Sequence, residues 1–361
     1  MSATSATVNK LTFEEAGGWP AVLSLVTSSK AVPGPLLSAA FSEILEGRAT
    51  PAQIAGLAIG LRTKGETLDE LQSALATMLS LSIAVPLAPD IAARAIDTCG
   101  TGGDRSHSVN VSTMAAFVVA GAGVPVCKHG GRAASSASGS ADVLEALGVA
   151  LELTPEAVAR CVNEAGIGFC LAPRFHPAMR HAAPVRRELG VATLFNFLGP
   201  LANPGRVRHQ VVGVSDENMA PKLAGVLAAR GTRAWVVRGE DGLDELSTTG
   251  PSRVWDVRAG IVTEARVDPA ALGLSLTTLA GLRGGSPQDN AAVTRSVLGG
   301  AKGPHRDVVV LNAAAALVVA GVAEDLSAGM AQACAVIEDG RAETALADLV
   351  RVSQREAASA A

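Results

Sequence analysis

The sequence predicts an α/β protein in which a small helical domain precedes a larger domain built on a mostly parallel sheet. The first ninety residues carry apolar side chains at helical spacing. After Pro86 and Pro89, short apolar runs alternate with helical stretches, which is typical of a parallel sheet with crossover helices. With 361 residues, 48% of them hydrophobic and 18% charged, the chain can bury more than one core.

Two helix starts in the first part of the chain are clear. Thr50 followed by Pro51 predicts an N-cap with proline at the first helical position. Thr67 and Glu70 have the spacing of a capping box, in which each side chain accepts a hydrogen bond from the other residue's backbone. Residues 1–18 have no apolar signal core and are expected to form a flexible tail.

Apolar runs predict the strands of the larger domain. Helices are expected after Ser112, Ser138 and Thr154 and in the tail after Ala342, and an antiparallel hairpin is expected over residues 254–267. The run 308–323 is shorter than the roughly 20 residues of a membrane span, and we expect a buried strand that leads into a buried helix. The candidate strands are residues 93–97, 124–128, 168–172, 210–214, 234–238 and 308–311.

Composition excludes several classes of protein. The net charge of −4 and the pI of about 5.9 give no basic footprint for nucleic acid. Aromatic residues are 3% of the chain and tyrosine is absent, so base-stacking surfaces are not expected. The five cysteines are odd in number and form no CxxC pair, which favours reduced thiols in the cytoplasm over a zinc site or disulfides. A nucleophilic role for Cys99 is disfavoured, since the sequence names no base to activate it.

Residues 97–113, with the sequence DTCGTGGDRSHSVNVST, are the most informative stretch. Glycines at 100, 102 and 103 let successive backbone N–H groups face one point. Ser112 or Thr113 is expected to cap the helix that follows, and a helix N-terminus favours negative charge. Together with Asp104, the stretch predicts a cradle for an anionic ligand that arrives with a divalent metal.

A second glycine-rich segment covers residues 128–140. It contains Lys128, His129 and Arg132, together with serines at 135, 136, 138 and 140 that can surround a phosphate. Neither segment matches a P-loop or the dinucleotide fingerprint. Both follow candidate strands, so we expect them to meet at the carboxyl edge of the sheet.

Charged residues in two further places have candidate roles. Asp244 and Glu245, just after the strand 234–238, are either Mg²⁺ ligands or a solvated acidic turn. Residues 172–204 concentrate arginine and histidine. Arginine binds carboxylates in bidentate fashion, although some of these residues must simply be solvated charges on helices.

The motifs GTGGD, NVST, KHG, SGSAD, FHPAMRH, LGPL and DGLDE occur in this order. With them the chain resembles the anthranilate phosphoribosyltransferase family of tryptophan biosynthesis, over about residues 19–350. The resemblance implies a homodimer with a small helical domain, residues 19–90 and about 184–206, and a large α/β domain, residues 91–183 and 207–361. The helical stripe of Ala39, Phe41, Ile44 and Leu45 is either part of the dimer interface or part of the core.

The resemblance also implies roles for individual residues. Ser112 and Glu245 would hold one Mg²⁺ ion, and Asp244 and Glu245 a second. Phosphoribosyl pyrophosphate would be held by Gly100, Gly103, Asp104, Ser108, Asn110, Ser112, Thr113, Lys128, Ser136 and Ser140. Anthranilate would be held by Arg186, which grips its carboxylate, and by Gly100, His129, Gly131 and His176.

The implied reaction moves the phosphoribosyl group to the amine of anthranilate and releases pyrophosphate, without a general base that the sequence identifies. The chain departs from the family pattern at Gly131, where asparagine is common, at Arg105, where glycine is usual, and at Ser108, where threonine is usual. Three alternatives are left: another aromatic acid as acceptor, an enzyme similar to pyrimidine-nucleoside phosphorylases, and a nucleotide-sensing paralogue without turnover.

Overall fold

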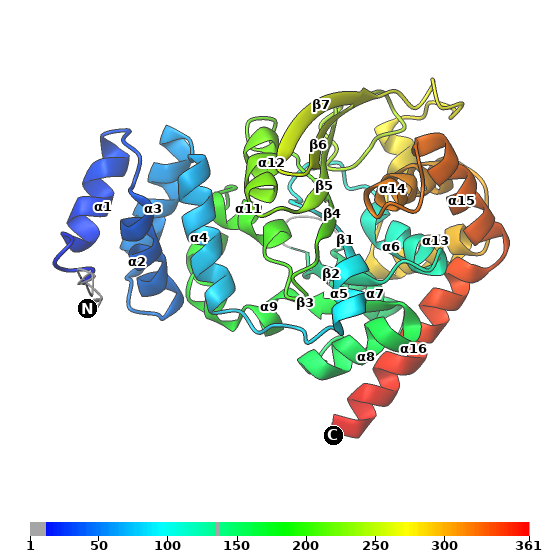
Figure 1. Ribbon diagram of the computed structural model, residues 1–361, viewed down its shortest axis with the longest axis horizontal. Helices are drawn as coiled ribbons and strands as arrows, with labels where there is room; N and C mark the ends of the chain where they lie inside the picture. The colour runs from blue at the N-terminus through cyan, green and yellow to red at the C-terminus, as the bar shows by residue number, and fades with distance from the viewer. Residues whose placement is uncertain (1–11, 134–137, 361) are drawn as a thin grey trace, which may run out of the picture. The chain divides into compact units, whose positions relative to one another are not determined.

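The computed structural model describes residues 12–133 and 138–360 (Figure 1). The chain forms two compact units, residues 1–81 with 178–195, and residues 82–177 with 196–361. Of the expected flexible tail, residues 1–11 lie outside the described residues. Residues 12–17 form a turn in which the Glu15 carboxylate accepts from the backbone N–H of Thr12 at 2.7 Å.

Paired helices form the core of the helical unit. Both expected capping boxes are present, Thr50 with Gln53 and Thr67 with Glu70. Phe41 and Ile44 are fully buried within this unit, so their stripe belongs to the core and not to an exposed interface. The helices are α1 (Gly18–Thr27), α2 (Gly34–Leu45), α3 (Pro51–Lys64), α4 (Leu68–Ser80) and α10 (Ala183–Leu189), and the short 3₁₀ helix η1 (Pro177–His181) precedes α10.

A seven-stranded sheet is the centre of the α/β unit, in the order β3-β2-β1-β4-β5-β6-β7. The first five strands are parallel and the last two pair antiparallel, as expected for the hairpin. Ala259 and Gly260 turn that hairpin with φ values of 51° and 79°, the left-handed pair of a type I′ turn. The strands are β1 (Ile96–Gly100), β2 (Val126–Gly130), β3 (Ile167–Leu171), β4 (His209–Gly213), β5 (Arg233–Gly239), β6 (Ser252–Arg258) and β7 (Ile261–Val267).

Helices cover both faces of this sheet. The chain runs from β1 to β2 in one direction and from β4 to β5 in the other, and right-handed crossovers then place the connecting helices on opposite faces. Accordingly, α6 packs on one face with α14, and α12 packs on the other (Figure 1). These and the remaining helices are α5 (Pro89–Arg94), α6 (Val111–Gly121), α7 (Ser140–Ala146), α8 (Pro155–Ala165), α9 (Ala172–Phe175), α11 (Leu194–Leu201), α12 (Ala220–Ala229), η2 (Leu279–Leu282), α13 (Pro287–Leu298), α14 (Pro304–Val319), α15 (Leu326–Glu338) and α16 (Arg341–Ala360).

One expected strand is wrong. Residues 308–311 lie inside the helix α14, which is buried on nearly all sides. Fully buried helices and buried strands both appear as continuous apolar runs, and length separates them. The helical stretch starts at Pro304, directly after Gly303, and its 16 residues are far longer than a strand of this sheet.

The domain boundaries also differ from those expected, since residues 82–90 and 196–206 belong to the α/β unit and residues 178–183 to the helical unit. Hydrogen bonds explain this difference. The side-chain amide of Asn203 donates to Asp97 at 2.7 Å and to the Cys127 carbonyl at 2.8 Å, both in the sheet. The backbone N–H of Val85 donates to the Pro204 carbonyl at 3.1 Å, which ties the two segments together.

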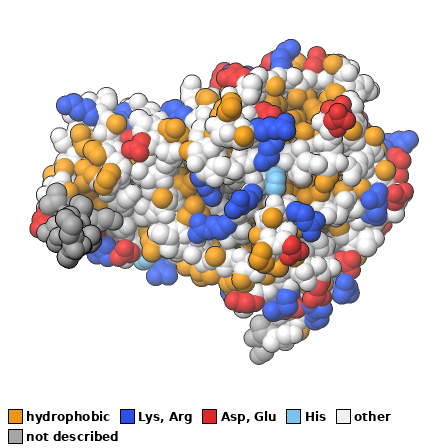
Figure 2. Space-filling model, in the orientation of Figure 1, with side chains coloured by type: hydrophobic (Ala, Val, Ile, Leu, Met, Phe, Trp, Pro, Cys, Tyr) orange, Lys and Arg blue, Asp and Glu red, His pale blue; other side chains and the backbone are white. Residues whose placement is uncertain are grey.

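Acidic, basic and apolar side chains are interspersed on the face drawn in Figure 2, in keeping with the small net charge. Within the described residues, every helix is too short or too polar to cross a bilayer.

Candidate active site

The candidate site lies where the strand order reverses, between β1 and β4. In open α/β sheets, ligands bind at such a point, beyond the carboxyl ends of the strands. A cavity of about 330 Å³ occupies this position. It brings together most of the predicted site residues: Gly100, Gly103, Asp104, Ser108, Asn110, Ser112, Thr113, Lys128, His129, Gly131, Ser140, Asp244 and Glu245. Ser136 lies outside the described residues.

The acidic pair reaches this cavity because two glycines make room for it. A Cβ atom on Gly213, at the end of β4, would lie 1.6 Å from the backbone oxygen of Asp244. A Cβ atom on Gly100, at the end of β1, would lie 2.4 Å from the Asp244 carboxylate. Gly213 is not among the predicted site residues, and its place at the end of a strand is the signal that identifies it.

Backbone donors hold both carboxylates. Gly102 N–H donates to Asp244 Oδ2 at 2.7 Å, and Ser112 N–H donates to Glu245 Oε1 at 3.0 Å. Ser112 lies in the first turn of α6, so Glu245 satisfies one of the unpaired N–H groups of that helix. The expectation that Ser112 or Thr113 caps α6 is therefore wrong, because Asn110 is the N-cap residue and its side chain makes no capping bond.

Without a bound cation, the negative charges of Asp244 and Glu245 are energetically unfavourable. Burial and the nearby Asp104 carboxylate raise the pKa of Asp244 to about 7. Burial and the charge of Asp244 raise the pKa of Glu245 as well. Both shifts show that the negative charges are poorly compensated by the protein alone, which fits a site for a cation.

The donor set suits Mg²⁺ that also binds substrate oxygens. Within the described parts of the chain, His, Cys, Asp and Glu side chains form no group of three that could hold a metal by themselves. Mg²⁺ is commonly bound by one or two carboxylates, water and phosphate oxygens. Asp244 and Glu245, with the Ser112 hydroxyl, match that pattern, and the solvated-turn alternative does not explain why both half-buried carboxylates line the cavity.

Lys128 supplies the nearest fixed positive charge. It is 2% exposed at the end of β2. Its ammonium donates to the Thr98 carbonyl and, at 3.2 Å, to the Ser112 hydroxyl. Its positive charge partly offsets the shift in the Glu245 pKa. Lys128 therefore organises Ser112 and the acidic pair as well as facing the cavity.

The Asp104 carboxylate accepts hydrogen bonds from within its own loop. It accepts from the Ser106 N–H at 3.1 Å and from the Ser106 hydroxyl at 2.7 Å. The next loop residues are strained, since Arg105 and His107 have φ values of 59° and 53°. The hydrogen bonds between Asp104 and Ser106 thus shape the loop around Arg105, the position where the family resemblance implies a glycine.

Asp142 of α7 holds two described residues of the second glycine-rich segment. Its carboxylate accepts from the N–H groups of Ala133 at 2.8 Å and Gly139 at 2.9 Å. Arg132 forms ion pairs with Asp142 and Glu145, so its charge is already compensated. Gly131 leaves open space, because the nearest atom to an added Cβ would be 3.9 Å away.

Two buried histidines lie beside the cavity, and each has one nitrogen without a partner. His129 Nδ1 donates to the Gly199 carbonyl at 3.1 Å, which leaves Nε2 as an unpaired acceptor. His176 Nε2 donates to the Ala202 carbonyl at 2.9 Å, which leaves Nδ1 unpaired. The two rings are 5.1 Å apart. Burial lowers the pKa of His129 to about 3 and that of His176 to about 4, so both rings are neutral.

Arg186 belongs to the helical unit. Its guanidinium lies 5.9 Å from the Phe195 ring centre, and its Nε atom is buried without a partner. Burial lowers the pKa of Arg186. The adjacent Arg187 is exposed, so the two arginines differ in their surroundings.

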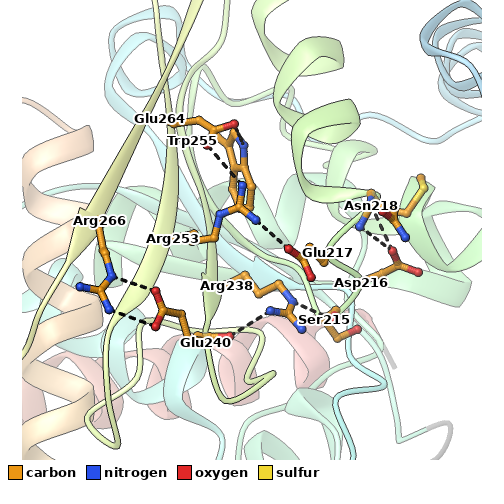
Figure 3. Close-up of polar contacts among 12 residues, drawn as sticks. Ser215, Asp216, Glu217, Asn218, Arg238, Glu240, Arg253, Trp255, Glu264 and Arg266 are labelled. Atoms are coloured by element: carbon orange, nitrogen blue, oxygen red, sulfur yellow. Dashed lines mark hydrogen bonds and ion pairs between the residues drawn. The ribbon is translucent and has the colours of Figure 1, made fainter.

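Three further residues support the site and were missed. The Ser215 hydroxyl, after β4, donates to the Gly102 carbonyl at 2.8 Å. Arg238 of β5 donates to the Ser215 carbonyl at 3.1 Å, as Figure 3 shows. Asn312 of α14 forms two bonds with the backbone of Leu246, which follows the acidic pair. A polar residue within the apolar run 308–319 was the available signal for Asn312. Burial raises the pKa of the Cys99 thiol well above its ordinary value, which opposes a nucleophilic role.

Family models match both parts of the chain. The glycosyl transferase family α/β domain matches residues 92–343, and the helical bundle domain of the same family matches residues 37–82. The anthranilate phosphoribosyltransferase of Salinispora arenicola is 52% identical over 340 residues, which cover 93% of this chain and 96% of the relative. The chain belongs to the anthranilate phosphoribosyltransferase family.

Solved structures of anthranilate phosphoribosyltransferases share this fold. The Thermus thermophilus enzyme aligns with a TM-score of 0.86 and 39% identity, covering 92% of this chain and 99% of that one. The Saccharomyces cerevisiae enzyme in complex with PRPP (phosphoribosyl pyrophosphate) and Mg aligns with a TM-score of 0.83 and 27% identity, covering 93% and 98%. These relatives support the interpretation of the chain as an anthranilate phosphoribosyltransferase and not the nucleoside phosphorylase alternative.

Proposed function

We propose that this chain transfers the phosphoribosyl group of PRPP to the amine of anthranilate. The nitrogen forms a bond to the anomeric carbon of the ribose, the bond from that carbon to the pyrophosphate oxygen breaks, and the proton lost by the amine passes to water or to the released pyrophosphate. The products are N-(5-phosphoribosyl)anthranilate and pyrophosphate, in tryptophan biosynthesis. The observation that carries the proposal is the cavity at the strand reversal, lined by two glycine-rich loops and a half-buried acidic pair.

The donor is held by the residues that the family resemblance implies. Thr113 supports this assignment, since its hydroxyl is buried in the lining of the cavity without a partner. We propose two Mg²⁺ ions, one held by Ser112 and Glu245 and one by Asp244 and Glu245. When bound, Mg²⁺ supplies positive charge to the pyrophosphate oxygens. The other proposed donor-binding residues are Gly100, Gly103, Asp104, Ser108, Asn110, Lys128, Ser136 and Ser140.

The residues of the chain contribute orientation and electrostatics in place of a general base. The amine of anthranilate is an aniline and is neutral near pH 7, so it attacks without prior deprotonation. His129 and His176 are too weakly basic to take a proton at that pH. Lys128 and the backbone N–H groups of the loops stabilise the charge that grows on the leaving pyrophosphate.

The acceptor is bound by polar atoms that lack partners within the protein. His129 lines the cavity, and its unpaired Nε2 accepts from the anthranilate amine, while His176, whose ring lies 5.1 Å from that of His129, continues the path. Gly131 leaves room for the aromatic ring, and Gly100 is the remaining residue proposed to contact the acceptor. Arg186 binds the carboxylate, because arginine offers paired donors to a planar anion. We also propose that the protein is a homodimer and that it is cytoplasmic. Light scattering of the purified protein tests the dimer.

The decisive experiment follows the loss of anthranilate fluorescence with PRPP and Mg²⁺ present. Turnover is expected, and its absence with wild-type protein that binds PRPP would show that the acceptor is wrong. Arg186→Ala should raise the KM for anthranilate about tenfold or more, since a charged hydrogen-bond pair is lost. Arg187→Ala, the exposed neighbour, should leave that KM unchanged. A rise in the KM for PRPP alone would contradict the role of Arg186.

A further inference from the structure

A chain of amide hydrogen bonds connects helix α13 to both glycine-rich segments. Gly285 N–H donates to Asn290 Oδ1 at 2.8 Å. Asn290 Nδ2 donates to Asn110 Oδ1 at 2.9 Å, and Asn110 Nδ2 donates to the Ser138 carbonyl at 3.2 Å. Asn110 and Ser138 both line the cavity, and they belong to the first and second segments, respectively. These hydrogen bonds therefore connect the two glycine-rich segments that line the proposed donor site.

The chain of hydrogen bonds from Gly285 to Ser138 can run in only one direction. A backbone N–H can only donate and a backbone carbonyl can only accept, so the ends at Gly285 and Ser138 fix the orientation of both amides between them. If Asn110 reversed its amide, its oxygen would face the Ser138 oxygen and its nitrogen would face the Asn290 nitrogen. Asn290 thus determines how Asn110 presents its side chain.

Asn290 is placed tightly. It is 3% exposed, on the first turn of α13. A Cβ atom on Gly284 would lie 2.5 Å from Asn290 Oδ1, so glycine is needed for this approach. The helix start is fixed by a capping box between Ser286 and Asp289. A buried amide held this closely acts as a rigid support.

The segment just before α13 holds the strained part of the first loop. Gly284 N–H donates to the His107 carbonyl at 2.8 Å, and Val109 N–H donates to the Leu282 carbonyl at 3.0 Å. Between them, Ser108 and Arg283 form an antiparallel bridge. His107 is in the left-handed region, which persists only where surrounding structure enforces it.

We propose that Asn290 is a positioning residue for PRPP, which acts by fixing the Asn110 amide and thereby the separation of the two donor-binding segments. The inference rests on the proposed function for the identity of the donor. Asn290 lines no part of the cavity, whereas Asn110 does. Its effect is therefore expected on the affinity for PRPP, with little direct effect on anthranilate.

The test uses Asn290→Asp, whose ionised carboxylate keeps the shape and the bond from Gly285 but cannot donate to Asn110. Calorimetry with PRPP and Mg²⁺, without anthranilate, should show about tenfold weaker binding, the loss expected for one buried hydrogen bond. In an Asn110→Ala background, Asn290→Ala should weaken PRPP binding less than about twofold further, because the two residues act in series. Additive losses in the two backgrounds would overturn the proposal.

Thr294→Val is the matched control. The Thr294 hydroxyl donates to the Asn290 backbone carbonyl at 2.7 Å in the same helix, and does not touch the chain of amides. This variant should lower the melting temperature and leave PRPP affinity unchanged. If Asn290→Asp likewise lowers only the melting temperature, Asn290 is structural and the proposal is wrong. Since binding is measured without acceptor, a wrong acceptor does not affect this result.

Discussion

The proposed donor side and the proposed acceptor side of the cavity are built in different ways. On the donor side, most polar groups of the segment after β1 are engaged by the protein, with Gly102 and Ser112 on the acidic pair and Asn110 on Asn290, and the Thr113 hydroxyl is the exception. On the acceptor side, His129 and His176 each keep a buried nitrogen without a partner. A site made of engaged groups is rigid before its ligand arrives, and a site with unpaired buried atoms penalises ligands that cannot pair with them.

The largest expected effect is on the donor side. Asp244→Asn with Glu245→Gln keeps the shape of both side chains and removes their charge. Turnover at saturating substrates should fall about 10²- to 10³-fold. The melting temperature of the ligand-free protein should stay constant or rise, because burial makes both charges unfavourable. Unchanged turnover would show that the pair holds no essential cation.

The acceptor side should dominate the acid sensitivity of folding. The pKa values of His129 and His176 are lowered to about 3 and about 4, so the unfolded chain binds protons that the folded state excludes. Stability is therefore fully present above pH 6.5 and is lost as pH falls, by about 2 kcal/mol per histidine at pH 5. Denaturant unfolding at pH 8, 6.5 and 5 measures this loss. The double variant His129→Asn with His176→Gln should show a shallower dependence, and an equal slope would contradict the assignment.

A pair of His129 variants separates the two nitrogens. His129→Asn can retain the bond to the Gly199 carbonyl and loses the Nε2 acceptor, so the KM for anthranilate should rise about tenfold, with the KM for PRPP unchanged. His129→Gln places an amide near the Nε2 position and should rescue part of that loss. Steady-state kinetics with each substrate varied in turn provide the measurement. Equal changes in both KM values would remove the distinction between the two sides.

Gly131 offers the smallest and most specific change. Gly131→Asn places an amide where the family commonly has one, in space that the structure leaves open. The KM for anthranilate should fall a few-fold through one added hydrogen bond, with stability within about 1 kcal/mol of the wild type. Gly130→Asn is the contrasting variant, because a Cβ there would lie 2.3 Å from the Ser140 hydroxyl. Gly130→Asn should lower the stability of the fold. An unchanged stability would contradict the close packing of Gly130 against Ser140 at the end of β2.

Much of the donor side could be predicted from the sequence, because glycines, capping residues and strand ends are local signals. Five of six candidate strands were found, and the sixth failed because a buried helix such as α14 has no polar face to reveal its period. Contacts between distant segments could not be found. Asn203 joins residues 196–206 to the sheet through Asp97, and Glu245 replaces the expected cap of α6, at separations of over one hundred residues.

Gly213 has a consequence for how this sequence can change over time. The obstacle to a side chain there is the backbone oxygen of Asp244, 1.6 Å from an added Cβ. A neighbouring side chain that is too close can be exchanged for a smaller one, but a carbonyl oxygen is present in every amino acid. No second-site replacement can therefore compensate at this position. In a saturation library selected for turnover, glycine should be the only survivor at 213, which makes this codon an internal standard for the stringency of the selection.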